Sequence, residues 1–423
     1  MQATINSGDT AWILASGALV LFMTPGLALF YGGMVRAKSA LNMMMMSFAA
    51  MGVTSIIWVL YGYSLAFGKS HHGIIGGFDH LGLGGTLDQT VGPEGHQIPT
   101  LAFAMFQMTF AIITVALLSG AIADRAKYGS WVLFVAIWIT LVYLPVAHWV
   151  FASQNGEGGW IVDHLHALDF AGGLVVEINS GAAALALAIV LGKRDGFKRD
   201  PMRPHNMPLV LLGAGALWFG WFGFNAGSAL SAGQLAATAM INTQIATAAA
   251  SMTWVAYEKY RDGKATTLGV ASGAVAGAVA ITPACGYLNP LGALILGLIA
   301  GVVSAWAVTR KYKYGYDDSL DVVGVHGVGG ILGMLSIGIF ATVTANVAGA
   351  NGLFFHGGIS QLDRQLFAVV VVALFSFGAT WFIATAIQKT IGFRVFRDDE
   401  LTGLDTTYHA ESAYDITGNS NRY

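Results

Sequence analysis

The sequence contains little charge and almost no cysteine. Only 10% of its 423 residues are Asp, Glu, Lys or Arg, whereas 55% are hydrophobic, and the mean hydropathy is +0.62. Because a soluble domain carries about a quarter charged residues, this composition excludes an ordinary soluble globular protein and indicates a polytopic membrane protein. The single cysteine, Cys285, excludes an internal disulfide.

Recognisable metal-binding and catalytic motifs are also missing. The sequence has no HExxH, no cysteine cluster and no set of three or four ligands at a suitable spacing, which argues against a metal site. Without an activated nucleophile, an enzyme is the least favoured class, and no cofactor is expected. The polar first ten residues lack the basic region of a cleavable signal. We interpret the basic loops as topology signals rather than nucleic-acid sites.

Long apolar runs are abundant. Runs of about 20 residues give eleven candidate transmembrane helices, near residues 11–31, 43–67, 99–121, 131–151, 167–191, 208–229, 234–256, 268–287, 290–309, 322–345 and 364–388. We therefore expect an all-α integral membrane protein. Residues 1–388 would form the transmembrane domain, and residues 389–423 a cytoplasmic C-terminal tail.

The Lys and Arg residues fall almost entirely on one side of this arrangement. When alternate loops are assigned to the cytoplasm, 19 of the 21 collect there, because only Lys69 and Arg364 fall in the other loops. This bias predicts an odd number of spans, with the N-terminus outside and the C-terminus inside.

Two spans share a spacing of ionisable residues. Asp169 precedes Glu177 by eight positions in the fifth span, and Asp318 precedes His326 by eight positions in the tenth. Because five is odd, two halves of five spans would have opposite orientations, which is the inverted-repeat plan of many transporters. Glu177 and His326 would then be symmetry mates that approach from opposite sides, and the eleventh helix would lie outside the repeat.

Glu177 and His326 lie in strongly apolar stretches. Charged groups at membrane depth are costly, and they generally pair with one another or face a cavity. An acid and an imidazole in contact are well suited to sharing or passing a proton, and they would titrate as a coupled unit. The alternative interpretation is a structural hydrogen bond between two helices, and both remain open on the residues alone.

Aromatic residues provide a second pattern. Phe106 and Phe110 are four positions apart and therefore lie on one helical face. Trp221, Phe224 and Ser228 follow one another at three- and four-residue steps. Aromatic faces attract cations, and a hydroxyl can accept a hydrogen bond from an ammonium-like ion. The other interpretation is packing against lipid or within the core.

Seven ordered segments are specific enough to indicate a family. They are TPGLALFYGG (24–33), LYGYSLAFG (60–68), ALDFAGG (167–173), RPHNMPLV (203–210), GWFGFNAGSA (220–229), TPACGY (282–287) and DVVGVHGVGG (321–330). With the tail GLDTTYHAESAYD (403–415), they closely resemble the ammonium transporter family, the bacterial Amt and fungal Mep proteins. The resemblance implies eleven helices in two inverted five-helix halves plus one, assembled as a homotrimer in the plasma or inner membrane, with one pore per subunit.

The resemblance also implies an outer recruitment site and a gate. Phe106 and Ser228 match residues of the outer vestibule that recruit ammonium, and Asp169 matches the acid near that site. Phe110 and Phe224 match the stacked phenylalanines that block the pore.

Two positions depart from the bacterial pattern. Trp221 and His326 match residues of the lumen, but the first of the two family histidines is replaced by Glu177, as in one class of fungal paralogues. The tryptophan expected in the vestibule falls on Phe151, which predicts a weaker cation–π contribution. Trp149 lies two residues away and should point elsewhere, so we do not count it as a replacement.

These roles predict uptake of ammonium, with methylammonium as an analogue. The cation would be recruited outside and deprotonated at the constriction, because a dehydrated ion in an apolar lumen is costly. Ammonia would then cross while its proton passes along Glu177 and His326. We expect stronger pH dependence and poorer exclusion of potassium than in a twin-histidine relative. The alternatives are an electroneutral ammonia channel and an ammonium sensor that signals through a separate partner.

The cytoplasmic side offers a surface for such a partner. Members of the family are often blocked by a trimeric PII-type regulator, and the basic loop 192–205 with the tail 389–415 would supply the contacts. The alternative is that these segments merely flank the membrane.

Overall fold

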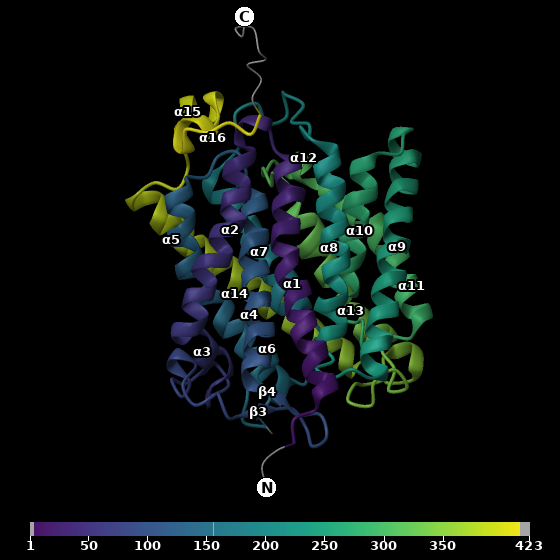
Figure 1. The fold of residues 1–423 in the computed structure, drawn as a ribbon. Helices are drawn as coiled ribbons and strands as arrows, with labels where there is room; N and C mark the ends of the chain where they lie inside the picture. The colour runs from purple at the N-terminus through teal and green to yellow at the C-terminus, as the bar shows by residue number, and fades with distance from the viewer. Residues whose placement is uncertain (1–3, 155, 415–423) are drawn as a thin grey trace, which may run out of the picture.

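The computed structural model describes residues 4–154 and 156–414. Long helices run roughly side by side from one end of the molecule to the other, and the start of α1 lies at the end opposite to the described part of the C-terminal tail (Figure 1). Strands are confined to two short antiparallel hairpins, in which β1 (Ser70–His71) pairs with β2 (Ile75–Gly76) and β3 (Thr90–Val91) pairs with β4 (Ile98–Pro99).

The α-helices are α1 (Ser7–Met34), α2 (Ala40–Ile57), α3 (Tyr63–Phe67), α4 (Thr100–Leu118), α5 (Tyr128–Trp138), α6 (Leu144–Phe151), α7 (Asn179–Leu191), α8 (Met207–Gly227), α9 (Gln234–Asp262), α10 (Thr267–Ile281), α11 (Pro290–Val308), α12 (Arg310–Tyr314), α13 (Val328–Phe340), α14 (Ser360–Thr390), α15 (Arg397–Thr402) and α16 (Leu404–His409). Four π-helical turns extend some of them, namely η2 (Trp58–Gly62), η5 (Ile139–Tyr143), η7 (Gly173–Ile178) and η8 (Val323–Gly327).

Nine helical stretches in the described part of the chain are long and apolar enough to cross a membrane. The predicted class, a helical membrane protein, is thereby confirmed. The other two predicted spans are also helices, but of a different kind. α9 is long enough but carries many Thr, Asn and Gln side chains, and α10 has only 15 residues, most of them buried among neighbouring helices.

Glycines let several of the helices approach one another closely. A Cβ at Gly277 in α10 would lie 2.6 Å from the carbonyl oxygen of Ala246 in α9, and one at Gly297 in α11 would lie 2.5 Å from the same atom. α1 and α8 lie side by side in the same manner (Figure 1), since a Cβ at Gly213 would lie 2.3 Å from the backbone nitrogen of Phe30. Backbone contacts of this kind are typical of membrane helices.

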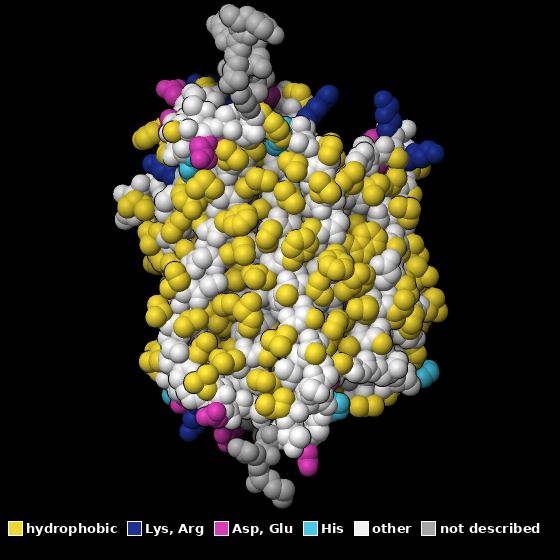
Figure 2. Space-filling view, viewed as in Figure 1, with side chains coloured by type: hydrophobic (Ala, Val, Ile, Leu, Met, Phe, Trp, Pro, Cys, Tyr) yellow, Lys and Arg dark blue, Asp and Glu magenta, His cyan; other side chains and the backbone are white. Residues whose placement is uncertain are grey.

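Charge is distributed by position along the bundle. Figure 2 shows a broad hydrophobic band between two polar ends, and most of the Lys and Arg side chains on this face lie at the end where Figure 1 places α15 and α16. Arg422, one of the 19 basic residues predicted on the cytoplasmic side, lies outside the described residues.

The described part of the tail is folded onto this end of the bundle. The carboxylate of Asp405 in α16 accepts hydrogen bonds from the N–H groups of Leu41 (3.0 Å) and Asn42 (2.8 Å) at the start of α2. Because the first N–H groups of a helix lack partners within it, Asp405 caps α2 from a distant part of the chain. Residues 415–423 of the predicted tail lie outside the described residues.

Candidate functional site

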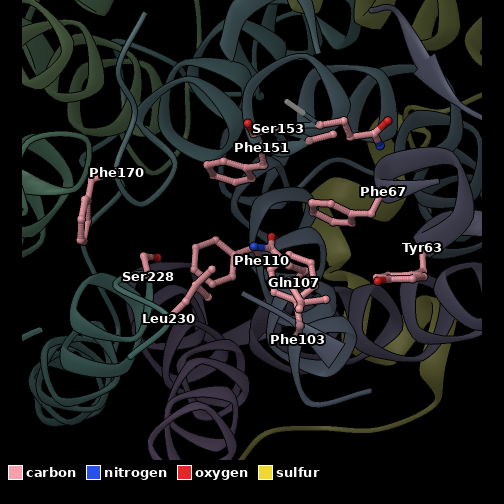
Figure 3. Close-up of a pocket in the computed structure, with 13 residues that line it drawn as sticks. Tyr63, Phe67, Phe103, Gln107, Phe110, Phe151, Ser153, Phe170, Ser228 and Leu230 are labelled. Carbon is pink, nitrogen blue, oxygen red and sulfur yellow. The ribbon is translucent and has the colours of Figure 1, made fainter. Parts of the chain in front are cut away.

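A cavity of about 340 Å³ opens at the end of the bundle that carries the strands. Aromatic and neutral polar side chains line it (Figure 3), and none of its described lining residues is Asp, Glu, Lys or Arg. The lining residues are Tyr63, Phe67, Val91, Phe103, Gln107, Phe110, Phe151, Ala152, Ser153, Gln154, Phe170, Ser228 and Leu230. Such a cavity can attract a small cation only through ring faces and dipoles.

Two of the four residues predicted to recruit ammonium line this cavity. Phe151 and Ser228 do, and the Ser228 hydroxyl donates to the Phe224 carbonyl (2.8 Å), which leaves its oxygen lone pairs free to accept. Phe106 does not: it is 0% exposed and packs behind the cavity wall, with its ring centroid 4.9 Å from that of Phe110. Helical periodicity places both phenylalanines on one face but does not decide which of them reaches the cavity.

Asp169 is also absent from the cavity lining. Its carboxylate accepts hydrogen bonds from the N–H groups of Gly172 (2.8 Å), Gly173 (2.7 Å) and Leu174 (2.7 Å) at the start of η7. An acid in this place satisfies N–H groups that have no partner within the helix and interacts favourably with the helix dipole. In this structure Asp169 therefore shapes the segment that carries Glu177.

Phe110 and Phe224 close the floor of the cavity. Their rings stack with centroids 4.2 Å apart and planes inclined by 22°, and each side chain is 1% exposed. Phe151 meets Phe110 edge to face at 6.5 Å. The two phenylalanines predicted as a gate are therefore brought together across the pathway.

A narrow lumen lies on the far side of this stack. Its free volume of about 10 Å³ is close to that needed for a single water molecule, so a hydrated ion does not fit. Its lining residues are Met23, Leu27, Phe30, Ile113, Leu117, Val176, Glu177, Leu217, Trp221, Phe224, Val275 and His326. Trp221 is held by a hydrogen bond from its indole N–H to the Thr282 hydroxyl (2.9 Å).

Glu177 and His326 meet in this lumen. Nδ1 of His326 lies 2.7 Å from Oε2 of Glu177, and the two residues are only 4% and 1% exposed. Burial makes two unpaired charges very costly, whereas one hydrogen bond can hold a shared proton between the two groups. The approach of these two residues, predicted from the eight-residue spacing, is present in the structure.

The two segments that carry this pair repeat one local structure. Just as Asp169 caps η7, the Asp318 carboxylate accepts from the N–H of Val323 (2.8 Å) at the start of η8. Three residues after each aspartate the backbone is left-handed, at Gly172 (φ 113°) and Asp321 (φ 66°). The repeated eight-residue spacing in the sequence therefore corresponds to a repeated capped turn. This turn precedes each of the two lumen residues, Glu177 and His326.

Two glycines at equivalent positions allow the two segments to approach each other closely. A Cβ at Gly181, four residues after Glu177, would lie 2.3 Å from the Cα of Gly327. One at Gly330, four residues after His326, would lie 2.8 Å from the Cβ of Glu177. Glycine at both positions lets the two helices touch backbone to backbone, which brings the short Glu177–His326 contact within reach.

Further cavities continue from the lumen to the opposite end of the bundle. His326 lies beside a second narrow space that reaches Leu320 and Asp321, and these two residues also line a cavity of about 670 Å³ at the far end. Next to that cavity, Arg194 makes ion pairs with Asp317 (2.9 Å) and Asp124 (3.2 Å).

Most of the lining positions were not predicted from the sequence, and three of them are informative. Phe103 lies one helical turn before Phe106 in α4, Gln107 follows it, and Phe170 comes directly after Asp169. A search along α4 at helical spacing would have included Phe103. Phe170 belongs to no helix, and periodicity gives no signal for it.

Comparisons with known proteins identify the family of this chain. A model described as the Ammonium Transporter Family matches residues 11–414. An ammonium transporter of Mycobacterium tuberculosis is 54% identical over 433 aligned positions, which cover 97% of this chain and 91% of that protein. The solved structure of Saccharomyces cerevisiae Mep2 has a TM-score of 0.85 at 34% identity, covering 93% of this chain and 91% of that one.

A solved structure named Sensor Amt Protein has a TM-score of 0.87 at 28% identity, covering 95% of this chain and 98% of that one. The family match spans nearly all of the chain, and several of its helices are apolar enough to cross a membrane. The chain is therefore an integral membrane protein that belongs to the ammonium transporter family, a family of transporters and channels rather than enzymes.

Proposed function

We propose that this protein takes up ammonium across the plasma membrane by separating ammonia from its proton. The observation that carries the proposal is the Glu177–His326 hydrogen bond of 2.7 Å, which lies directly behind the Phe110–Phe224 stack. A proton-sharing pair stands where a desolvated cation would be most costly. Methylammonium, which has the same charged head, is the expected analogue.

Recruitment begins in the outer cavity. Phe151 offers a ring face and Ser228 an accepting oxygen, while the neutral lining does not repel a cation. Phe106 and Asp169 contribute from behind, the first by supporting the Phe110 ring and the second by capping η7.

Deprotonation occurs at the stacked rings. Because the lumen has room for about one small molecule, ammonium must lose its hydration shell to enter. Ammonia loses much less hydration energy than the ion, so it crosses the apolar lumen past Trp221. The proton follows through Glu177 and His326, and the two species rejoin at the other end.

The wider architecture is part of the same proposal. We infer eleven spans, made of the nine apolar stretches with α9 and α10, and we place the N-terminus outside and the C-terminus inside. Family membership supports a homotrimer, with one pore in each subunit. Residues 1–388 form the membrane domain and residues 389–423 the cytoplasmic tail.

A PII-type regulator is the proposed cytoplasmic partner. The loop 192–205 and the described tail form one continuous surface, because Nε2 of His205 lies 3.0 Å from the Tyr414 hydroxyl and Arg397 pairs with Asp195 at 3.3 Å. A partner that binds this surface would contact the loop and the tail together.

The proposal is tested by solid-supported membrane currents with ammonium, methylammonium and potassium across pH. We expect ammonium-evoked currents from the purified protein. Glu177→His should flatten the pH profile and improve the exclusion of potassium, because it removes the one carboxylate among the described lumen residues. Glu94→His, the same change at an exposed loop position, serves as the control and should behave like the wild type.

Two results would contradict the proposal. Ammonia transport without current would favour the electroneutral channel, in which Glu177 and His326 only shape the lumen. An unchanged pH profile and unchanged ion selectivity in Glu177→His would show that the carboxylate takes no part in proton transfer or selectivity.

A further inference from the structure

One aromatic wall of the outer cavity is not used in the proposed recruitment site. Phe170 lies in the irregular segment between η6 (Trp160–Leu165) and η7, and it lines the cavity. Figure 3 shows its ring edge-on, across the cavity from Phe67, with one face turned toward the space beside Ser228 and Phe110. The ring therefore presents a face, rather than an edge, to whatever occupies that space.

The ring is held in place by the TPACGY segment (282–287). A Cβ at Gly286 would lie 2.1 Å from Cε2 of Phe170, so the ring packs against backbone that only glycine leaves open. Tyr287 meets the ring at 5.6 Å with the planes nearly perpendicular, and the Phe170 N–H donates to the Pro283 carbonyl (3.0 Å). These contacts fix the ring from the side opposite the cavity.

A fixed ring face is useful in this cavity because charged groups are absent from its described lining. A small cation there is stabilised by ring quadrupoles and by the accepting oxygen of Ser228. Phe151 supplies a smaller face than a tryptophan would, so a second face at the same site compensates for part of the difference. Both rings are already held in place, so little side-chain conformational entropy is lost when the cation binds.

We propose that Phe170 is a cation-binding wall of the outer site and helps to set its affinity for ammonium and methylammonium. The inference rests on the proposed function, since it assigns a further residue to the same recruitment site. It also assigns a role to Gly286 and Tyr287, which position the ring without contacting the cation.

The test is the concentration dependence of methylammonium-evoked current. Phe170→Leu should raise the half-saturating concentration about 3- to 10-fold, the range of a single partly desolvated cation–π contact, with little change in the maximal current. Phe170→Tyr keeps the ring face and should remain within about 2-fold of the wild type. Phe354→Leu makes the same change at a 71% exposed position on another segment and should have no effect.

A second variant guards against a folding defect. Gly286→Ala keeps the Phe170 ring but displaces it, so it should also raise the half-saturating concentration; membrane abundance and gel filtration check that each variant is folded. The inference is overturned if folded Phe170→Leu keeps the wild-type concentration dependence, or if only its maximal current falls. Absence of current from the wild type would instead contradict the proposed electrogenic function, and methylammonium binding measured by thermal shift would still test Phe170.

Discussion

Asp317 shows how neighbouring residues set the charge state of a single side chain. Burial alone would raise its pKa, but hydrogen bonds from Arg194 and the nearby charge of Arg125 lower the pKa of Asp317 to about 2 from the ordinary 3.8. A carboxyl whose pKa is lower in the folded state contributes stability above pH 4, and this stability is lost as the pH falls from about 4 to about 2.

Replacing Asp317 with Asn should therefore destabilise the protein at pH 7. A difference of nearly two pKa units corresponds to about 2 kcal/mol, and the gap to the wild type should narrow as the pH falls below 4. Thermal unfolding in detergent at pH 7, 5 and 3 measures both effects. Asp88→Asn, at an exposed loop position, should change stability by less than about 0.5 kcal/mol. A gap that stays constant with pH would contradict the assignment.

Single residues differ in how well sequence alone places them. Glu177 and His326 could be paired because their spacing from an aspartate repeats, and that spacing has a structural cause in the two capped turns. The resemblance assigns Asp169 to recruitment, although an aspartate three residues before a pair of glycines, close to a helix start, is also a capping signal. Phe106 is buried rather than facing the cavity, because the exposure of a helical side chain depends on how neighbouring helices pack.

At the scale of elements, the contact between the two halves depends on two glycines. Gly181→Ala would place a methyl group 2.3 Å from the Gly327 Cα, and backbone cannot rotate away as a side chain can. We expect a loss of about 1–3 kcal/mol, as for other overpacked sites, seen as a lower unfolding temperature in detergent. Separation of the helices should also lengthen the Glu177–His326 contact and change the pH profile of transport.

Gly378→Ala is the matched control for this prediction. Gly378 is exposed within α14, and a Cβ there would meet no atom within 4 Å. Because alanine favours a helix over glycine, the control should be neutral or slightly more stable. Equal effects of the two substitutions would show that the close approach at Gly181 is not what stabilises the contact.

The positions of the helices could be predicted better than their interruptions. Apolar runs locate each long helix to within a few residues because burial in lipid demands them. They do not reveal the turns at η2 and η5, since a π-helical turn continues the same apolar pattern. The eighth predicted span, 268–287, ends at Ile281 because TPACGY forms turns that support Trp221 and Phe170.

At the scale of the whole molecule, the two ends differ in charge and in structure. The end with the strands carries an uncharged cavity, whereas the opposite end carries the buried Arg194–Asp317 pair and the folded tail. The sequence predicts this polarity through its Lys and Arg distribution. It does not predict that the tail caps α2 through Asp405, because that contact joins residues more than 360 positions apart.

The polarity leads to a prediction about orientation in the membrane. Cys285 is buried and is the only cysteine, so Cys285→Ser gives a background free of other thiols. His72→Cys in the strand-bearing end and Lys264→Cys between α9 and α10 both place a cysteine at an exposed position. A membrane-impermeant thiol reagent applied to intact cells should label the first variant at once and the second only after permeabilisation, because basic loops stay inside.

The reverse pattern would invert the proposed orientation, and labelling of both variants in intact cells would contradict an odd number of membrane-spanning helices between the two positions. Five proposed spans separate residue 72 from residue 264, and α9 is the fifth of them, so agreement would also support α9 as a span despite its polar composition.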